Sequence, residues 1–586
     1  MELILTGNQA IARAARDAGA ALGVGYPGTP STEVLETLAT LEGAVAQWAP
    51  NEKVALEVGV GVAIGGRRAL VTMKHVGMNV AADPLFTVSY TGVAGGLVVL
   101  VADDPGMHSS QNEQDSRHYA RAAKVPMLEP SDSQEAYDFT RLAFQLSEQY
   151  DTPIFLRTTT RLSHGKSTVQ PGERETDIPA AVAPHDPAKY VMIPAFARRR
   201  HLVVEERMAK LAAWVNGSEL TRVEYRDRAV GIITSGINYQ YVREMAPEAS
   251  VLKLGMVYPL PMDAIRAFAA EVQTLYVVEE LDPFIEDQLR AAGIAVIGKE
   301  RFPVFGELSP ALVAQGLGID VPAMPADELP QRPPAMCPGC PHRGVFSVLK
   351  RLRLTITGDI GCYTLGVAPP LNALDTCVCM GASIGVAHGL EKAGVDPGKF
   401  VGVIGDSTFL HSGITGVLDM VYNASPATIL ILDNGTTAMT GRQEHPGTGK
   451  TLMGASAPQV DLEALVRALG VQDVTVIDAY DLKALETHVK AALAHPGPSV
   501  LIARRPCMLI PHELRPKAEL NQEHCKLCGA CLRLGCPAIS KAAVEVDGKT
   551  RYMPVIDKLL CQGCAVCIDT CSFGALVAVE NAEVSA

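Results

Sequence analysis

The chain has 586 residues, with 51 Lys or Arg against 64 Asp or Glu and a formal net charge of -13. This negative balance argues against a nucleic-acid partner. No apolar run of about 18 residues occurs, so we expect no membrane span. Charge and glycine interrupt residues 1–7, which do not resemble a signal peptide, and we expect a cytoplasmic protein. Fourteen cysteines in such a chain suggest metal sites rather than disulfides.

Helical and strand patterns alternate through the first 170 residues. Helices are predicted over 8–20 and 54–64, and strands over 23–26, 69–73 and 96–102. Alternation of this kind predicts a parallel sheet with helices on both faces. We therefore expect a first α/β domain over 1–170, and more than one domain in a chain of this length.

A glutamate lies at the start of the predicted helix over 54–64. Glu52 is followed by small residues at Ala55, Gly59 and Gly61. This spacing resembles the pyrimidine-binding helix of thiamine diphosphate enzymes. The resemblance implies that Glu52 bonds a ring nitrogen of the cofactor, which requires a carboxylate in a mostly apolar pocket. Glu57 is the competing candidate with a poorer match, and a solvated glutamate at a helix start is the alternative.

Two polar segments follow predicted strands in this domain. Residues 26–31 resemble the substrate-side loop of 2-oxoacid:ferredoxin oxidoreductases, which implies that the Thr29 hydroxyl faces the oxoacid carboxylate. A plain turn is the alternative.

The polar residues over 103–118 suit the rim of a pocket, where Arg117 or His118 would pair with a carboxylate. A solvated loop of the same composition is the alternative.

The middle of the chain predicts a second α/β domain. Residues 166–200 are rich in Pro and charge and are predicted to be a linker. Strands are then predicted over 229–234, 251–255 and 274–279. A second Pro-rich segment, over 322–334, is predicted to be a hinge.

Two further predicted strands end on metal-competent side chains. The strand over 399–404 is followed by Gly405 and Asp406, and the strand over 427–432 by Asp433 and Asn434. Open α/β sheets bind ligands at the carboxyl ends of their strands. Magnesium takes one or two carboxylates and completes its shell with phosphate oxygens. A magnesium site is therefore expected where these strands end.

This pairing resembles the diphosphate motif of thiamine diphosphate enzymes. The resemblance implies that Asp406, Asn434 and the backbone carbonyl of Thr436 hold Mg²⁺. Two departures occur, because Ser407 replaces the usual glycine and Asp433 stands where an asparagine is common. Two ordinary strand ends with turn residues are the alternative.

Eight cysteines near the end of the chain form two runs of four. In each run, two residues separate the first cysteine from the second and the second from the third. The pattern resembles two-cluster bacterial ferredoxins, in which the fourth cysteine of each run serves the other cluster. Zinc is the alternative. One extra residue before Cys536 and Ser572 in place of the usual proline remove no ligand. The resemblance implies one [4Fe-4S] cluster on Cys525, Cys528, Cys531 and Cys571, and a second on Cys561, Cys564, Cys567 and Cys536.

Four more cysteines match the layout of a cluster near the cofactor in related oxidoreductases. They are Cys337, Cys340, Cys362 and Cys507, and the resemblance implies a third [4Fe-4S] cluster. Free thiols, or a loop that touches the diphosphate, are the alternative. Cys377 and Cys379 are expected in the core or beside the cofactor.

The whole chain resembles the alpha subunits of the indolepyruvate ferredoxin oxidoreductase family. The resemblance is carried by residues 51–53, 72–79, 337–343 and 358–363. The fold it implies is α/β, with several doubly wound parallel-sheet domains of thiamine diphosphate enzyme type and a small two-cluster ferredoxin domain. The implied domains are a pyrimidine-binding type over 1–170, a linker and transketolase-C-like domain over 171–330, a diphosphate and Mg domain over 331–512, and a ferredoxin-like domain over 513–586.

That family converts aryl pyruvates and coenzyme A to aryl-acetyl-CoA and CO₂, and passes the electrons to ferredoxin. The resemblance also implies a separate beta subunit with a gamma-type domain, in an α2β2 assembly. A non-oxidative decarboxylase or carboligase with structural clusters is one alternative, and a non-catalytic electron-transfer subunit is another. Further cofactor contacts are implied at Gly405, Ser407, His342, Gly361, Cys362 and Met380.

Overall fold

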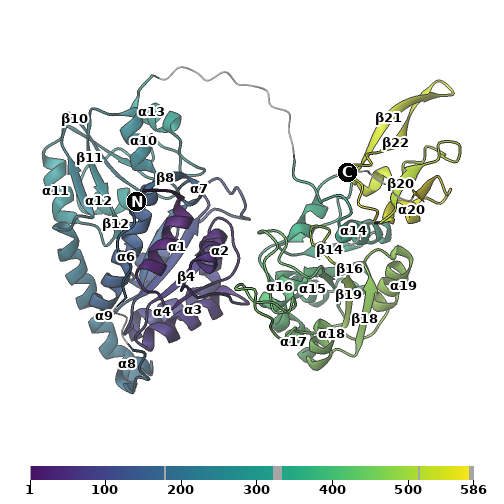
Figure 1. Ribbon diagram of the computed structural model, residues 1–586, viewed down its shortest axis with the longest axis horizontal. Helices are drawn as coiled ribbons and strands as arrows, with labels where there is room; N and C mark the ends of the chain where they lie inside the picture. The colour runs from purple at the N-terminus through teal and green to yellow at the C-terminus, as the bar shows by residue number, and fades with distance from the viewer. Residues whose placement is uncertain (1, 177–179, 321–332, 512–514, 580–586) are drawn as a thin grey trace. The chain divides into compact units, whose positions relative to one another are not determined.

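Residues 2–176, 180–320, 333–511 and 515–579 are described by a computed structural model of the protein. The chain divides into unit 1, which is Met1–Ala326 with Thr451–Ala455, and unit 2, which is Asp327–Lys450 with Ser456–Ala586. Figure 1 shows unit 1 in purple to teal and unit 2 in green to yellow. Most of the predicted hinge over 322–334 lies outside the described residues.

A seven-stranded sheet lies at the centre of unit 1, in the order β12-β6-β7-β5-β4-β2-β3. All neighbours are parallel except β12 with β6. Side chains alternate between two cores, with Val98 and Leu100 on one face and Val99 and Val101 on the other. The strands are β2 (Leu22–Gly25), β3 (Ala46–Trp48), β4 (Ala69–Lys74), β5 (Leu97–Asp103), β6 (Met127–Leu128), β7 (Ile154–Thr159) and β12 (Met256–Tyr258).

Helices cover both faces of this sheet, as the alternation of patterns predicted. On one face lie α1 (Gly7–Asp17), α2 (Thr32–Thr40) and α6 (Ser133–Tyr150), and on the other α3 (Glu52–Ile64), α4 (His75–Thr91) and α5 (Arg117–Ala123).

The predicted linker over 166–200 has regular structure toward both ends and none over the described residues 170–176 and 180–186. After the short helix α7 (Thr160–His164), β8 (Lys166–Val169) pairs antiparallel with β1 (Leu3–Thr6). The helices α8 (Pro187–Tyr190) and α9 (Pro194–Asn216) follow. Helix α9 is mostly exposed and charged and buries only a narrow stripe that includes Val204 and Leu211. Its composition therefore resembles that of a linker.

A second, four-stranded sheet completes unit 1, in the order β13-β10-β11-β9, with β9 as an antiparallel edge. Its strands are β9 (Thr221–Glu224), β10 (Asp227–Ser235), β11 (Ala249–Leu254) and β13 (Thr274–Val278). One face packs on α10 (Asn238–Met245) and α13 (Pro310–Leu317), and the other on α11 (Met262–Ala270) and α12 (Phe284–Ala291).

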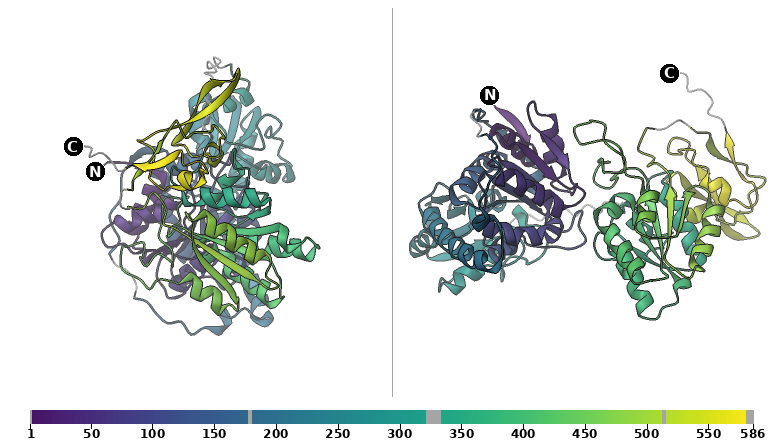
Figure 2. Two further views of the ribbon diagram at one scale, coloured as in Figure 1. Left: turned by 90° about the vertical axis from the view of Figure 1, so that its right-hand side faces the viewer. Right: turned by 90° about the horizontal axis from the view of Figure 1, so that it is seen from below.

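The main sheet of unit 2 is six-stranded and wholly parallel, in the order β15-β14-β16-β17-β19-β18. Ile429 and Ile431 of β17 face one core, and Leu430 and Leu432 face the other. Helices therefore flank both faces, and Figure 2 shows them around the green strands. The strands are β14 (Thr355–Gly358), β15 (Thr376–Cys377), β16 (Phe400–Gly405), β17 (Thr428–Asp433), β18 (Asp473–Asp478) and β19 (Ser499–Arg504).

The two helical layers differ in what else they contact. Helices α15 (Ala382–Lys392), α17 (Ile414–Tyr422) and α18 (Leu462–Ala468) line one core, and α14 (Pro341–Leu352) and α19 (Leu482–Leu493) line the other. The second core continues into the cysteine-rich segment, since Phe346 belongs to one cluster with Leu534, Val566 and Leu576.

The cysteine-rich segment has little regular structure apart from two antiparallel pairs. Strand β20 (Lys517–Leu520) pairs with β23 (Leu576–Val579), and β21 (Ile539–Val546) pairs with β22 (Lys549–Ile556). The β21–β22 hairpin extends away from the rest of the segment (Figures 1 and 2). The short helices η4 (Leu532–Leu534) and α20 (Val566–Thr570) lie within the two cysteine runs.

Candidate active site

A buried carboxylate lies at the carboxyl edge of the unit 2 sheet. Asp406, at the start of α16 (Asp406–Thr408), is 2% exposed. Its Oδ1 accepts from the Ser407 N–H at 2.8 Å, and its Oδ2 accepts from the Gly435 N–H at 2.8 Å. The Ser407 hydroxyl lies 2.8 Å from that of Thr437, which explains a serine where glycine is usual. The ends of β16 and β17 are thus tied together around Asp406.

The Asn434 amide is fixed on both sides. Its Nδ2 lies 3.2 Å from His342 Nε2, and its Oδ1 accepts from the Thr436 N–H at 3.0 Å. Burial lowers the pKa of His342 to about 4, although the Asp406 carboxylate raises it. The imidazole is therefore neutral near pH 7 and can accept from Asn434.

A second histidine lies beside the carboxylate. His445 Nε2 is 3.4 Å from Asp406 Oδ2, is buried, and has no hydrogen-bond partner among the described residues. An unpaired buried nitrogen there suits a phosphate oxygen, and the carboxylate, amide and carbonyl oxygens nearby are hard ligands. These residues fit Mg²⁺ and a diphosphate. Sequence spacing did not indicate His445, because it lies in the irregular chain after β17.

A further buried carboxylate organises the neighbouring loop. Asp359 follows β14 and accepts from the Gly381 N–H at 2.9 Å and the Ser383 N–H at 3.0 Å. Burial raises the pKa of Asp359. These bonds hold the chain around half-buried Met380 against the loop that contains Gly361. The Thr408 hydroxyl donates to the Ile360 carbonyl at 2.9 Å and joins this loop to α16.

The four cysteines predicted to form a third cluster come from three loops of unit 2. The Cys507 N–H donates to the Asn434 carbonyl at 2.9 Å, so this thiol follows directly on the Asp406 site. Burial, with smaller contributions from Cys362 and Cys337, raises the pKa of Cys340 to about 12. Burial, with smaller contributions from Cys507 and Cys337, raises the pKa of Cys362 to about 11. These mutual effects require the thiols to lie near one another.

The eight C-terminal cysteines line two cavities with mostly apolar walls. Cys531 and Cys567 are the two buried members, and all eight are free thiols. Each cavity combines three cysteines of one run with the last cysteine of the other, as the ferredoxin pattern predicts. One is lined by Cys525, Cys528, Cys531 and Cys571, and the other by Cys536, Cys561, Cys564 and Cys567 together with Cys340 and Arg343. Thiols gathered in this way fit [4Fe-4S] clusters.

Glu52 lies at the start of α3 in unit 1. The Asn51 side chain caps this helix by accepting from the Val54 N–H at 2.9 Å. Glu52 is 4% exposed, whereas Glu57 is exposed and pairs with Lys53. A Cβ at Gly77 of α4 would lie 2.5 Å from Glu52 Oε1, so the carboxylate fills the space that this glycine leaves. Burial favours Glu52 over Glu57 as the pyrimidine partner.

A buried lysine lies near Glu52. Lys74 ends β4, is 9% exposed, and donates from Nζ to the Ser109 carbonyl at 3.0 Å. Burial lowers the pKa of Lys74 to about 8, while the Asp104 and Glu52 carboxylates raise it. Sequence analysis placed Lys74 in the stretch 72–79 that carries the family resemblance but assigned it no role.

Thr29 belongs to the loop between β2 and α2. It is half-buried, and its carbonyl accepts from the Ser109 hydroxyl at 3.3 Å. A Cβ at Gly28 would lie 3.1 Å from Lys74 Cγ. The loop thus lies beside Lys74, and the contact between the Thr29 hydroxyl and a substrate stays a prediction.

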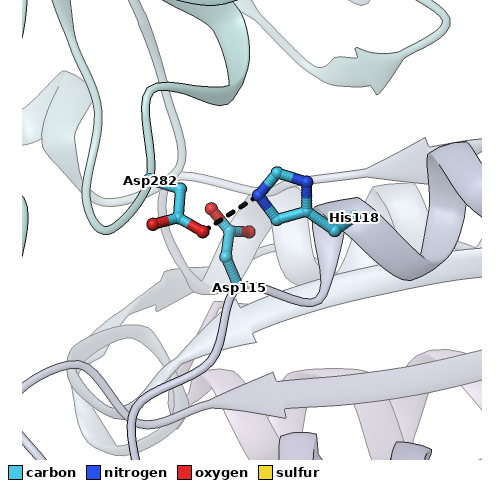
Figure 3. Close-up of side chains that lie close together, drawn as sticks. All are labelled: Asp115, His118 and Asp282. Atoms are coloured by element: carbon cyan, nitrogen blue, oxygen red, sulfur yellow. Dashed lines mark hydrogen bonds and ion pairs between the residues drawn. The ribbon is translucent and has the colours of Figure 1, made fainter.

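Arg117 is held by groups of this chain. Its Nη2 lies 2.5 Å from Asp115 Oδ2 and its Nη1 lies 2.5 Å from Glu279 Oε2, with both carboxylates buried. These contacts favour a structural role over the predicted substrate contact. Figure 3 shows that His118 points at Asp282, with Nε2 2.9 Å from Oδ2, beside Asp115. The ligand atoms of these three side chains lie close enough together to surround an ion. The Asp115 carboxylate, however, already forms an ion pair with Arg117.

Comparisons with known proteins bear on both units. Residues 13–213 match the family model "Pyruvate flavodoxin/ferredoxin oxidoreductase, thiamine diP-bdg". Residues 359–503 match "Thiamine pyrophosphate enzyme, C-terminal TPP binding domain". Indolepyruvate oxidoreductase subunit IorA of Archaeoglobus fulgidus is 40% identical, with 97% of this chain and 96% of that protein covered. The chain belongs to the IorA family.

Other members of the IorA family agree with this assignment. The IorA subunit of Methanothermobacter marburgensis is 42% identical, with 98% of this chain and 97% of its own length covered. Among solved structures, a 2-oxoglutarate:ferredoxin oxidoreductase from Magnetococcus marinus aligns at TM-score 0.46 and 17% identity, covering 54% of this chain and 65% of that one. This IorA-family chain is a subunit of a thiamine diphosphate-dependent 2-oxoacid oxidoreductase. None of its described helices could span a membrane.

Proposed function

We propose that the chain catalyses the oxidative decarboxylation of aryl pyruvates, with coenzyme A as acyl acceptor and ferredoxin as electron acceptor. The products are aryl-acetyl-CoA and CO₂. The observation that carries the proposal is the continuity of the diphosphate-type sheet with the cysteine-rich segment in one buried core. The names of the IorA relatives, which are indolepyruvate oxidoreductase subunits, support the aryl substrate class.

Four side chains hold the cofactor in this proposal. Asp406, Asn434 and the Thr436 carbonyl are the Mg²⁺ ligands, and His342 orients the Asn434 amide. Glu52 holds a proton at a ring nitrogen of the aminopyrimidine. When bound, thiamine diphosphate supplies a nucleophilic carbon that also takes up the electrons left by CO₂. Gly405, Ser407, Gly361 and Met380 are proposed cofactor neighbours from the loops around Asp406.

The cysteine sets would hold iron–sulfur clusters, and each cluster would carry one electron at a time away from the cofactor. The proximal set adjoins the Asp406 site, because the Cys507 N–H donates to the Asn434 carbonyl. This set consists of Cys337, Cys340, Cys362 and Cys507. Cys340 also lines the cavity of the second ferredoxin set. These contacts support a path in which the proximal set would lie between the cofactor site and the two ferredoxin sets. An acyl group remains after oxidation and needs a thiol acceptor, which is the reason to propose coenzyme A.

The remaining parts of the proposal concern organisation. The word "subunit" in the names of the relatives supports a partner chain, and we propose a beta subunit with a gamma-type domain in a cytoplasmic α2β2 assembly. The four domains are proposed at 1–170, 171–330, 331–512 and 513–586.

Anaerobic turnover with a panel of 2-oxoacids, with and without the beta subunit, tests the proposed reaction. Aryl pyruvates should reduce ferredoxin with one CO₂ released per two electrons, and only when coenzyme A is present. Release of CO₂ without ferredoxin reduction would instead favour a non-oxidative decarboxylase.

Iron analysis of the full chain tests the third cluster. Three four-iron clusters give about twelve irons per chain, and two give about eight. The double variant Cys337→Ala/Cys507→Ala should lose about four irons, whereas Cys379→Ala, at an exposed cysteine outside the three sets, should lose none. An unchanged iron content in the double variant would remove the proximal cluster.

A further inference from the structure

Arg343 is a buried cation with no carboxylate partner in the part of the chain that the structure describes. It lies in the first turn of α14, is 6% exposed, and forms no ion pair with an acidic side chain among the described residues. A buried charge is costly unless an opposite charge lies nearby. The position of Arg343 therefore requires a source of negative charge.

The guanidinium joins the two cysteine-bearing segments of unit 2. Its Nη1 donates to the carbonyls of Leu534 at 3.0 Å and Gly535 at 2.6 Å, just before Cys536. Its Nη2 donates to the Met336 carbonyl and contacts that of Cys337 at 3.5 Å. All of these acceptors are neutral, and each pair adjoins a cysteine of a different set.

The surroundings of Arg343 identify the missing negative charge. The residue lines the cavity of the second ferredoxin set together with Cys340 of the proximal set. Burial lowers the pKa of Arg343, and the Cys536 and Cys340 thiols raise it. The nearby groups that can carry negative charge are thus cysteines of both sets.

We propose that Arg343 is a positioning residue whose charge sets the reduction potentials of the second ferredoxin cluster and the proximal cluster together. The inference rests on the cluster assignments of the proposed function. A cluster held by four thiolates gains negative charge on reduction. A fixed cation in a low-dielectric site stabilises the reduced form, so the potential rises. One cation between two clusters acts on both in the same direction, so it raises both potentials while changing the difference between them little.

Redox titrations of the holoenzyme followed by EPR test this role. Arg343→Gln removes the charge and should shift two of the three cluster signals to more negative potentials. The signal of the Cys525, Cys528, Cys531 and Cys571 cluster should stay in place and serves as an internal reference. Arg343→Lys keeps the charge and should restore most of the shift.

A matched control and a second variant guard against a purely structural effect. Arg533 is exposed and donates to the Cys528 carbonyl at 3.0 Å, and Arg533→Gln should shift potentials little because water screens its charge. Gln562 lines the same cavity as Arg343, and Gln562→Lys should shift the second-cluster potential to more positive values even if Arg343→Gln fails to assemble.

The outcomes separate this inference from the cluster assignments. Unchanged potentials in Arg343→Gln with full iron content overturn the inference. An equal shift in Arg343→Lys also overturns it, because it would show that the hydrogen bonds of Arg343 matter rather than its charge. If Arg343→Gln does not assemble, an unmoved potential in Gln562→Lys overturns it. If the parent enzyme shows only two clusters by iron and EPR, the proximal cluster fails, and the effect on the second cluster still decides the role of Arg343.

Discussion

Lys74→Met should raise the stability of unit 1 at neutral pH. The fall in the pKa of Lys74 from 10.5 to about 8 corresponds to about 3 kcal/mol that opposes the charged form in the fold. The substitution also removes the hydrogen bond to the Ser109 carbonyl, which contributes about 1 kcal/mol. A net gain of about 2 kcal/mol is therefore expected at pH 7.

The gain should depend on pH with a definite sign. Below the folded pKa of about 8, both the folded and unfolded states are protonated, and the full cost of burying the ammonium is present. Between pH 8 and 10.5 the folded state releases the proton first, so the parent protein becomes more stable relative to the variant. The advantage of Lys74→Met should shrink by about 1 kcal/mol between pH 7 and pH 9.

Urea unfolding monitored by tryptophan fluorescence isolates the relevant part of the molecule. The chain has two tryptophans, Trp48 and Trp214, and both lie in unit 1. Lys53→Met, at an exposed lysine, is the control and should change stability little. A variant that is less stable than the parent at pH 7, or a difference independent of pH, would refute the desolvation of Lys74.

Three further predictions concern the cofactor and the clusters. Asp406→Ala should weaken Mg²⁺-dependent thiamine diphosphate binding by at least about 100-fold, since even outer-shell partners of a metal contribute that much, and normal binding by calorimetry would rule out this ligand. Glu52→Gln should leave the cofactor bound but slow proton exchange at its C2 carbon, and exchange at the parent rate by NMR would move the role to Glu57. Cys564→Ala should abolish ferredoxin reduction under substrate, and unimpaired reduction would place that cluster off the electron path.

The features that sequence could predict are those set by local pattern. Apolar runs ending on Gly405 and Asp433 gave the two strands that flank Asp406, because buried parallel strands are continuous apolar segments. The crosswise grouping of Cys536 and Cys571 with the opposite runs was implied by the resemblance to two-cluster ferredoxins, and these cysteines line the corresponding cavities.

The features that sequence could not predict depend on contacts between distant segments. The proposed role of Arg343 depends on its hydrogen bonds to the carbonyls of Leu534 and Gly535. The proposed role of His445 depends on its distance to Asp406. Arg117 was expected to pair with a substrate carboxylate because the polar density of residues 103–118 suits a pocket rim, whereas Asp115 and Glu279 enclose it. The regular structure toward the ends of the predicted linker over 166–200 was not indicated for a similar reason, since β8 depends on pairing with β1 and α9 buries only a narrow stripe.

The continuous core between α14 and the cysteine-rich segment has a consequence for how the enzyme loses activity on exposure to oxygen. Leu534, Val566 and Leu576 pack with Phe346 and Leu482, so the cysteine loops form part of the wall of the diphosphate-type fold. Metal sites of this kind contribute to folding, and removing the metal loosens the chain that carries it. Oxygen that destroys the proposed clusters should therefore also weaken retention of thiamine diphosphate. Inactivation by air would then have two stages, with bleaching of the iron–sulfur absorbance followed by release of the organic cofactor.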